Sequence, residues 1–283
     1  MDKQNMTGFF DIHSHFLPGL DDGPEDYGQC LEAAKRYVAI GVDRVIATPH
    51  WIQGSRWTPT PEEVRRRTAE AEQWLHEAGM GLILLPGMEI ALSDSLCRHF
   101  IASDFISLAE QGYFLIEFPL ISHLKATAAD VVGTMLKRQQ ENHFIIAHPE
   151  RCIMFQENLD SIRKMVAGGM LTQVNISSIL GYSGKTAQMA ALKLCNENLV
   201  HFLGSDSHAR AGRMPPDPKE MSELAGLIGA DAVAAGFRDN PNRLLLGEQV
   251  FPLQMKATEP GSTLFPSLPK KVVQGLLKLF RKQ

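Results

Sequence analysis

The chain has 283 residues, with 28 basic and 32 acidic side chains, so its formal net charge is 28 − 32 = −4. With 44% hydrophobic and 21% charged residues, it is too apolar for a disordered protein. It has no stretch of the roughly 18 apolar residues that a membrane span needs. A slightly acidic chain also lacks the basic stripe typical of nucleic-acid binding, so we expect no nucleic-acid partner.

The first residues, Met1 to Thr7, are polar and do not resemble a signal peptide, so we expect a cytoplasmic protein. The cysteines are far apart and form no Cys-x-x-Cys pair: Cys30, Cys97, Cys152 and Cys195. This spacing favours reduced thiols over disulfides and leaves no thiolate zinc site.

Seven short apolar runs, each followed by a stretch of helical periodicity, predict repeated β-α units. The predicted strands are Phe9–His13, Val42–His50, Leu82–Glu89, Tyr113–Glu117, His143–His148, Leu171–Ile176 and Val200–Asp206. Their last residues are 28 to 39 positions apart, which is about the length of one strand, one helix and two loops. Because the runs are continuous rather than alternating, both faces of the sheet should be covered, as in a parallel barrel or an open wound sheet.

Helices are predicted between the runs. Thr60, Pro61 and Glu63 have the residue types of a helix N-cap and capping box. The other expected helices are Glu25–Ile40, Leu124–Asn142, Asn158–Gly168, Lys185–Asn198 and Lys219–Gly236. Four prolines follow Phe251, so we place the end of the main domain at residue 250, with 251–283 as a linker and tail.

Histidine, aspartate or glutamate side chains occur at or just beyond the ends of six of the seven runs. They are His13, His15, His50, Glu89, Glu117, His148, Asp206 and His208. In β/α folds the carboxyl ends of the strands form one crevice, so these residues should converge there. Imidazoles and carboxylates together are ligands for ions such as Mn, Fe and Zn. Taken singly, each residue has an ordinary alternative, either a surface position or a salt bridge.

Eight short motifs along the chain resemble the PHP superfamily of metal phosphoesterases. Within it they are most similar to the CpsB/CapC-type manganese-dependent protein-tyrosine phosphatases of bacterial capsule and exopolysaccharide operons. The motifs are Asp11-Ile12-His13-Ser14-His15, Leu20-Asp21-Asp22-Gly23-Pro24, Thr48-Pro49-His50, Gly87-Met88-Glu89-Ile90, Ile116-Glu117-Phe118, Ala147-His148-Pro149-Glu150-Arg151, Gln173-Val174-Asn175 and Ser205-Asp206-Ser207-His208. They occur in order from about Phe9 to Leu246.

The resemblance implies a distorted (β/α) barrel of seven units, a PHP-type TIM-like barrel, that holds three divalent ions. Manganese is the expected metal, with Fe, Zn or Mg as alternatives. The implied ligand sets are His13, His15, Glu89 and Asp206 for one ion, Glu117 and His148 with Glu89 bridging for a second, and Asp22, His50 and His208 for the third.

Four ligand carboxylates and three divalent ions leave about +2 at the site, which attracts a phosphate dianion. A hydroxide bridging two ions is a competent nucleophile for attack on phosphorus. Arg151 and Arg213 are expected to clamp the phosphate, with surface pairing to Glu150 or Asp217 as the alternative. Asp206 and His208 are the candidates for a catalytic general acid.

Aromatic residues near the predicted site could favour phosphotyrosine over phosphoserine. Trp51, Trp57 or Phe118 could flank the phenol ring of a substrate, and ordinary loop packing is the alternative. The 270–283 tail carries five basic residues and an apolar face if helical, so it could bind a membrane surface, the barrel or a partner subunit.

The sequence therefore predicts a metal-dependent phosphatase that hydrolyses phosphotyrosine. The substrate, which only the resemblance implies, would be the tyrosine cluster of a bacterial autokinase that controls capsule or exopolysaccharide synthesis. Alternatives are a small-molecule phosphatase similar to histidinol-phosphate phosphatases, an amidohydrolase-type hydrolase, and a non-catalytic regulator that binds the kinase. The oligomeric state stays open.

Overall fold

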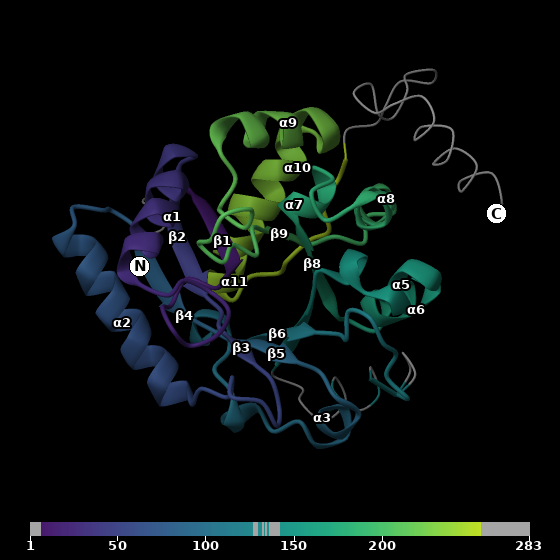
Figure 1. Ribbon diagram of the computed structural model, residues 1–283. Helices are drawn as coiled ribbons and strands as arrows, with labels where there is room; N and C mark the ends of the chain where they lie inside the picture. Colours follow the sequence, from purple (N-terminus) through teal and green to yellow (C-terminus); the bar gives the residue numbers. More distant parts are fainter. Residues whose placement is uncertain (1–6, 127–129, 132, 134, 136–141, 256–283) are drawn as a thin grey trace.

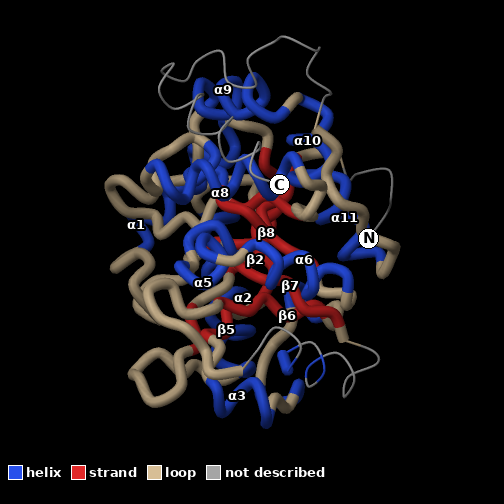
Figure 2. The backbone as a smooth tube through the Cα atoms, turned by 90° about the vertical axis from the view of Figure 1, so that its right-hand side faces the viewer, coloured by secondary structure: helices blue, strands red, loops and turns tan. Residues whose placement is uncertain are grey.

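The computed structural model describes residues 7–126, 130, 131, 133, 135 and 142–255. Its strands form the interior, and its helices lie around them (Figures 1 and 2). The strands are β1 (Phe9–Ser14), β2 (Val42–Ala47), β3 (His50–Trp51), β4 (Ile83–Pro86), β5 (Glu89–Ala91), β6 (Tyr113–Glu117), β7 (His143–Ala147), β8 (Leu171–Asn175) and β9 (Phe202–Gly204).

The strands are all parallel and form two sheets, with the orders β1-β2-β4 and β3-β5-β6-β7-β8-β9. Beyond the two sheets, the backbone N–H of Asp206 donates to the carbonyl of His13 at 3.0 Å, and that of His15 donates to Ser207 at 2.8 Å. These bonds join the end of β1 to the segment that follows β9. The result is an α/β fold with parallel sheets, as expected. The closed barrel of seven units stays a prediction.

Two of the seven predicted strands are each broken in two. The run ending at His50 divides into β2 and β3 at Thr48-Pro49, and the run ending at Glu89 divides into β4 and β5 at Gly87. A side chain at position 87 would force its neighbours to move, because a Cβ there would lie 2.7 Å from Ile46 and 2.9 Å from Leu108. The break starts a new strand at Glu89, which pairs with His50 of β3.

The helices follow the expected order, with one correction. They are α1 (Tyr27–Ala39), α2 (Pro61–Glu77), α3 (Asp94–His99), α5 (Ile153–Glu157), α6 (Leu159–Ala167), α7 (Ile176–Ile179), α8 (Lys185–Asn196), α9 (Pro218–Ile228), α10 (Ala230–Ala234) and α11 (Asn240–Leu246). Short 3-10 turns span Ala102–Asp104, Leu108–Glu110 and Pro149–Arg151, and a π-helical turn spans Ala235–Asp239.

The single helix expected over Lys219–Gly236 is wrong, because Gly229 has a φ of 94° and separates α9 from α10. Side-chain caps fix several other helix starts. Asp26 caps α1, Thr60 caps α2 by accepting from the N–H of Glu63 at 3.2 Å, and Asp217 forms a full capping box with Glu220 on α9.

The hydrophobic core has two parts. The larger lies between strands and helices, and the smaller lies among the strands, where Phe10, Ile12, Leu115 and Phe202 are fully buried. Leu244 of α11 completes the smaller cluster. This inner core supports the carboxyl ends of the strands from below.

The described chain continues past Val250: Leu253 is buried, and its backbone N–H donates to Val200 at 2.7 Å. The division of the chain at residue 250 stays a prediction. The tail at 270–283 and most of the helix expected over Leu124–Asn142 lie outside the described residues. Within the described part of the chain, no helix has the length and apolar character needed to cross a membrane.

Candidate metal centre

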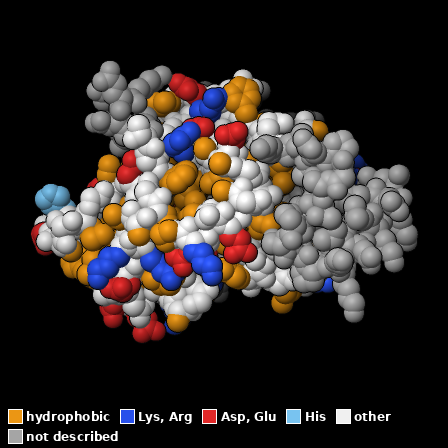
Figure 3. Space-filling model, turned by 90° about the horizontal axis from the view of Figure 1, so that it is seen from above, with side chains coloured by type: hydrophobic (Ala, Val, Ile, Leu, Met, Phe, Trp, Pro, Cys, Tyr) orange, Lys and Arg blue, Asp and Glu red, His pale blue; other side chains and the backbone are white. Residues whose placement is uncertain are grey.

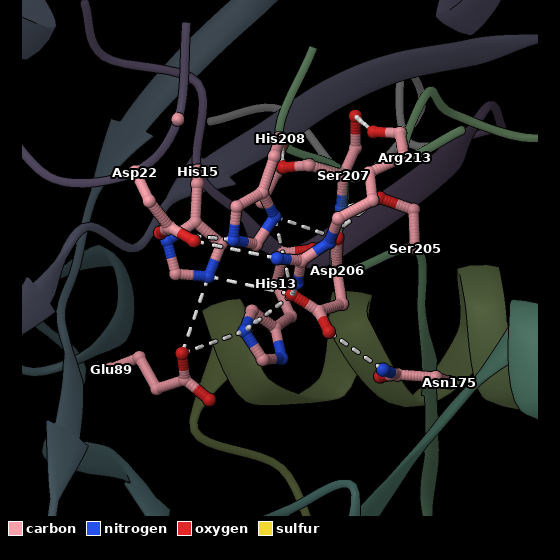
Figure 4. A network of polar contacts seen from close by, with 12 residues as sticks. His13, His15, Asp22, Glu89, Asn175, Ser205, Asp206, Ser207, His208 and Arg213 are labelled. Atoms are coloured by element: carbon pink, nitrogen blue, oxygen red, sulfur yellow. Dashed lines mark hydrogen bonds and ion pairs between the residues drawn. The ribbon is translucent and has the colours of Figure 1, made fainter. Parts of the chain in front are cut away.

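The structure brings all nine predicted ligands together at the carboxyl ends of the strands. Figure 4 labels His13, His15, Asp22, Glu89, Asp206 and His208 among them. They form four overlapping groups whose ligand atoms lie within 4.8 Å of one another. The groups are His15 with Asp22, His50 and His208; His13 with His15 and Asp206; His13 with Glu89 and His148; and His50 with Glu89 and Glu117.

Glu89 lies at the centre of the cluster. Its Oε2 atom is 3.3 Å from His13 Nε2, 3.2 Å from His15 Nε2 and 3.0 Å from His50 Nδ1, and its Oε1 atom is 2.9 Å from His148 Nε2. The break between β4 and β5 gives Glu89 this position, because it is the first residue of the new strand. A carboxylate so placed can bridge two ions.

Seven of the nine candidate ligands have a buried side-chain atom without a hydrogen-bond partner among the described residues. These atoms are Nε2 of His13, His15 and His208, Nδ1 of His50 and His148, Oε2 of Glu89 and Oδ1 of Asp22. Burying so many polar atoms without partners costs free energy unless something else binds them. Nitrogen and carboxylate oxygen atoms suit borderline divalent ions, so these residues fit the predicted metal site.

The orientation of three histidines is set through their Nδ1 atoms. Nδ1 of His13 lies 2.8 Å from Gln173 Oε1, Nδ1 of His15 lies 2.6 Å from Asp21 Oδ2, and Nδ1 of His208 lies 3.0 Å from the carbonyl of Asp206. Each of these partners accepts a hydrogen bond, so Nδ1 carries the proton and Nε2 keeps its lone pair facing the cluster.

Strand β8 links two ligands that come from distant parts of the chain. Gln173 Nε2 donates to Asn175 Oδ1 at 2.8 Å, and Asn175 Nδ2 donates to Asp206 Oδ2 at 2.8 Å. Since the amide nitrogen of Gln173 is used in this way, its oxygen is the atom that faces His13. The sequence motif contained Gln173 and Asn175, but it gave no role to either residue or to Asp21.

Two of the candidate ligands adopt unusual backbone conformations. His148 has a φ of 28° and Asp206 a φ of 50°, a region that non-glycine residues rarely occupy. Strained backbone of this kind persists where the surrounding structure enforces it, and it clusters at functional sites.

Burial and charge act against each other on the carboxylates. Burial raises the pKa of Glu89, but the imidazoles of His13 and His50 outweigh it and hold that pKa well below its usual range. Burial likewise opposes ionisation of Asp206, yet contacts with His15 and His13 keep its pKa well below normal. Burial and the nearby charge of Glu89 raise the pKa of Glu117. Glu89 and Asp206 are therefore ionised in the site.

The pKa values of the histidines shift in different directions, according to the charges around each ring. Burial lowers the pKa of His13, but Glu89 and Asp206 outweigh it and the pKa is raised; in His15 the carboxylate of Asp21 has the same effect. Burial and the neighbouring His15 lower the pKa of His208 to about 4. The carboxylates thus favour a positive charge at the rings of His13 and His15, which a bound cation would supply in place of a second proton on Nε2. His208 is neutral at neutral pH.

Both arginines predicted to bind phosphate lie at this cluster. Arg151 Nη1 is 2.6 Å from Asp206 Oδ2, and Arg213 Nη2 is 3.1 Å from Asp206 Oδ1. Arg213 Nη1 also lies 3.5 Å from Asp22. Neither alternative partner, Glu150 or Asp217, forms these pairs. Their positions at the cluster suit the binding of an anion next to the metal ligands.

Of the three aromatic residues proposed to flank a substrate ring, Phe118 is ruled out. It has no exposed surface and packs against Phe155, because neighbouring residues of a strand point to opposite faces and Glu117 faces the site. Trp51 packs edge-on against Phe105, and Trp57 stacks on His50 with ring centroids 5.7 Å apart.

Comparison with known proteins shows the family to which this chain belongs. Residues 9–246 match the family described as capsular polysaccharide synthesis, CpsB/CapC. The chain is 33% identical to the tyrosine-protein phosphatase YwqE of Bacillus subtilis over 70% of its own length and 76% of that protein. It is 23% identical to the tyrosine-protein phosphatase CpsB of Streptococcus pneumoniae over 85% and 99% of the two chains.

The fold of this chain is also similar to that of a solved tyrosine phosphatase structure. The crystal structures of YwqE from Bacillus subtilis and CpsB from Streptococcus pneumoniae are described as those of unique metal-dependent tyrosine phosphatases. The matching chain has a TM-score of 0.75 and 28% sequence identity, and the match covers 88% of this chain and 100% of that one.

Proposed function

Because this chain belongs to the CpsB/CapC family of capsular polysaccharide synthesis, we propose that it is a metal-dependent tyrosine-protein phosphatase. The observation that carries the proposal is the cluster of buried, unpartnered nitrogen and oxygen atoms around Glu89. These atoms lie 3.0 to 3.3 Å from one another without forming hydrogen bonds, an arrangement that suits nitrogen and oxygen atoms sharing bound ions.

We assign the nine converging residues to the binding of divalent ions, with manganese as the expected metal and three as the expected number. When bound, such ions lower the pKa of water and offset the charge of a phosphate group. Asp21 and Gln173 hold the Nε2 atoms of His15 and His13 toward the ions. We assign Glu89 to two of them, because its two oxygen atoms lie near different histidines.

Arg151 and Arg213 are assigned to the phosphate oxygens. Both guanidinium groups form ion pairs with Asp206, so they are held in position before a substrate binds. A guanidinium group can bind two phosphate oxygens at once, and this orients the phosphorus atom as well as holding it.

Proton donation to the leaving group needs little help from the protein. A phenol has a pKa of about 10, so a phenolate leaves more readily than the alkoxide of serine. Asp206 is ionised and already paired with two arginines, which makes it a poor acid. The lowered pKa of His208 leaves little of it protonated at neutral pH. We therefore assign both residues to metal binding first.

We infer the biological substrate by analogy with the family. A tyrosine-phosphorylated bacterial kinase of a capsule or exopolysaccharide system, acting in the cytoplasm, is the expected partner. Contact with the inner face of the membrane through 270–283 stays a prediction.

The test is phosphate release by purified, chelator-stripped protein from a tyrosine-phosphorylated and a serine-phosphorylated peptide, with and without added manganese. We expect manganese-dependent release that favours phosphotyrosine and is lost in His13→Ala. Release from neither peptide by folded, metal-loaded protein would overturn the proposal and favour a small-molecule phosphatase.

A further inference from the structure

A cavity of about 580 Å³ adjoins the metal centre on one side. It lies between the connection from α7 to α8 and the loop that leads to α9, and Asp206 is the single candidate ligand among the residues that line it. Figure 3 looks down on the side of the molecule that carries α9, where hydrophobic side chains gather among basic and acidic ones. The cavity is therefore a compartment beside the ions, distinct from the space that would hold them.

The end of the cavity nearest the metal centre is charged and recessed. Asp206 is 6% exposed, and the Arg151 side chain, which pairs with it, is 26% exposed. At the opening, Tyr182 is 63% exposed and the side chain of Arg213 is 40% exposed. A phosphate held by Arg151 and Arg213 beside Asp206 would leave the space next to Tyr182 to the group that carries the phosphate.

One part of the wall is apolar, and the rest is lined by Arg36, Ser177, Ser183 and Glu220. Ile176 and Leu180 come from α7 and its C-cap, Tyr182 follows in the next turn, and Met214 comes from the loop after the last ligand. An aromatic ring gains most from a surface of this kind, because aliphatic and aromatic contacts add up over its two faces.

The walls are held in place before any ligand binds. The backbone N–H of Tyr182 donates to the carbonyl of Ser177 at 2.9 Å. On the facing side, Arg36 donates to the carbonyl of Pro215 at 2.9 Å and fixes the loop that carries Met214. A preformed pocket avoids the entropy cost of ordering its walls on binding.

We propose that this cavity receives the phenol ring of a phosphotyrosine side chain, with the phosphate on Arg151 and Arg213 and the ring against Leu180, Tyr182 and Met214. The assignment rests on the proposed function and names the residues that make it selective. A volume of about 580 Å³ exceeds that of one ring, so a neighbouring residue of the substrate peptide fits as well.

The experiment compares kcat/KM for a phosphotyrosine peptide, a phosphoserine peptide of the same sequence and glycerol phosphate, which has no ring. The variants are Tyr182→Ala, Met214→Ala and Tyr182→Phe in the metal-loaded, full-length protein. Trp57→Ala tests the competing wall beside His50. Phe251→Ala is the matched control, because Phe251 is 47% exposed and packs on Arg243 away from the cavity.

Loss of one wall contact should lower kcat/KM for phosphotyrosine relative to glycerol phosphate by roughly 10-fold or more. We expect this loss in Tyr182→Ala and Met214→Ala, recovery of the ratio in Tyr182→Phe, and the wild-type ratio in Phe251→Ala. A wild-type ratio in both truncations, or a larger loss in Trp57→Ala than in either, would overturn the assignment.

Failure of the proposed function would give a different result. In that case the wild-type protein itself would release no phosphate from the phosphotyrosine peptide. The cavity assignment alone fails when the wild-type protein is active on that peptide and the wall variants keep its preference.

Discussion

The Nδ1 atom of His15 lies 2.6 Å from Oδ2 of Asp21, and this carboxylate also organises the loop around it. Asp21 Oδ2 accepts the backbone N–H of His50 at 2.9 Å, and its Oδ1 accepts that of Gly23 at 2.9 Å. One carboxylate that sequence reasoning passed over thus fixes the segments that carry three candidate ligands, His15, Asp22 and His50.

Removal of the Asp21 carboxylate is expected to weaken metal binding. In Asp21→Ala, His15 loses the acceptor that holds its Nδ1 proton, and the loop carrying Asp22 loses two backbone anchors. Changes in such supporting groups typically cost about 10- to 100-fold in metal affinity or activity. Isothermal titration with manganese measures the effect, with the exposed Asp104→Ala as control. Equal affinities in the two variants would contradict this role.

Gln173 is expected to matter through the tautomer of His13. In Gln173→Leu the imidazole can place its proton on Nε2, which would then no longer bind an ion, so bound metal and kcat/KM should both fall by roughly 10-fold or more. Metal content after dialysis, measured by mass spectrometry, checks this. The control is Gln188→Leu, since Gln188 is also buried but donates to the carbonyl of Ile179. A full metal content in Gln173→Leu would refute the role of the tautomer.

Substitution of the two arginines should lower activity on the substrate without lowering metal affinity. Arg151→Met and Arg213→Met each remove a charged donor to phosphate, so we expect kcat/KM to fall by roughly 100-fold. Metal affinity should stay level or rise, because Asp206 loses a competing cation. Steady-state kinetics and manganese titration separate the two effects. Arg66→Met, on the exposed face of α2 and paired with Glu70, is the control; a loss of metal in either arginine variant would argue against phosphate binding.

His201 should make stability depend on pH. Burial lowers its pKa to about 4, and its Nδ1 accepts the backbone N–H of Thr172 at 3.2 Å, which requires the neutral ring. In the unfolded chain the pKa of His201 is about 6.5, so below that pH the unfolded chain binds a proton at this ring and the folded chain does not. The free energy of unfolding therefore falls by about 2 kcal/mol by pH 5.

Urea unfolding at pH 7 and pH 5 measures this loss. His201→Asn keeps an acceptor for Thr172 and cannot titrate, so its stability should fall by about 2 kcal/mol less than that of the wild-type protein over this range. The exposed His76→Asn should behave as wild type. An identical pH dependence in His201→Asn and wild type would contradict the buried neutral state.

The order of strands and helices and eight of the nine clustered residues could be predicted because their signals are local. Each of the eight ends an apolar run or lies just beyond one, and parallel strands bring such ends together whatever the details of the sheet. Asp22 was implied only by the family resemblance. The break at Gly87 could not be predicted, since it depends on how closely Ile46 and Leu108 approach the backbone. It moves Glu89 from the end of one strand to the start of another without removing it from the site.

The residues that orient the candidate ligands could not be predicted from the sequence, for a different reason. Gln173 acts on His13, which is 160 positions away, and no sequence spacing records that contact. Asp21 acts through a turn whose geometry only the folded loop defines. The error at Phe118 was avoidable: once Glu117 is taken to face the site, alternation along β6 places the next residue on the opposite side.

The central claim is that metal held around Glu89 drives the hydrolysis of phosphotyrosine. The most direct test measures phosphate release from a phosphotyrosine peptide against manganese bound per chain, from stripped to saturated protein, alongside Glu89→Ala shown to be folded by circular dichroism. We predict that the rate rises from near zero with bound metal, and that Glu89→Ala binds less metal and stays inactive. Full activity in stripped wild-type protein, or wild-type metal content and rate in Glu89→Ala, would contradict the claim.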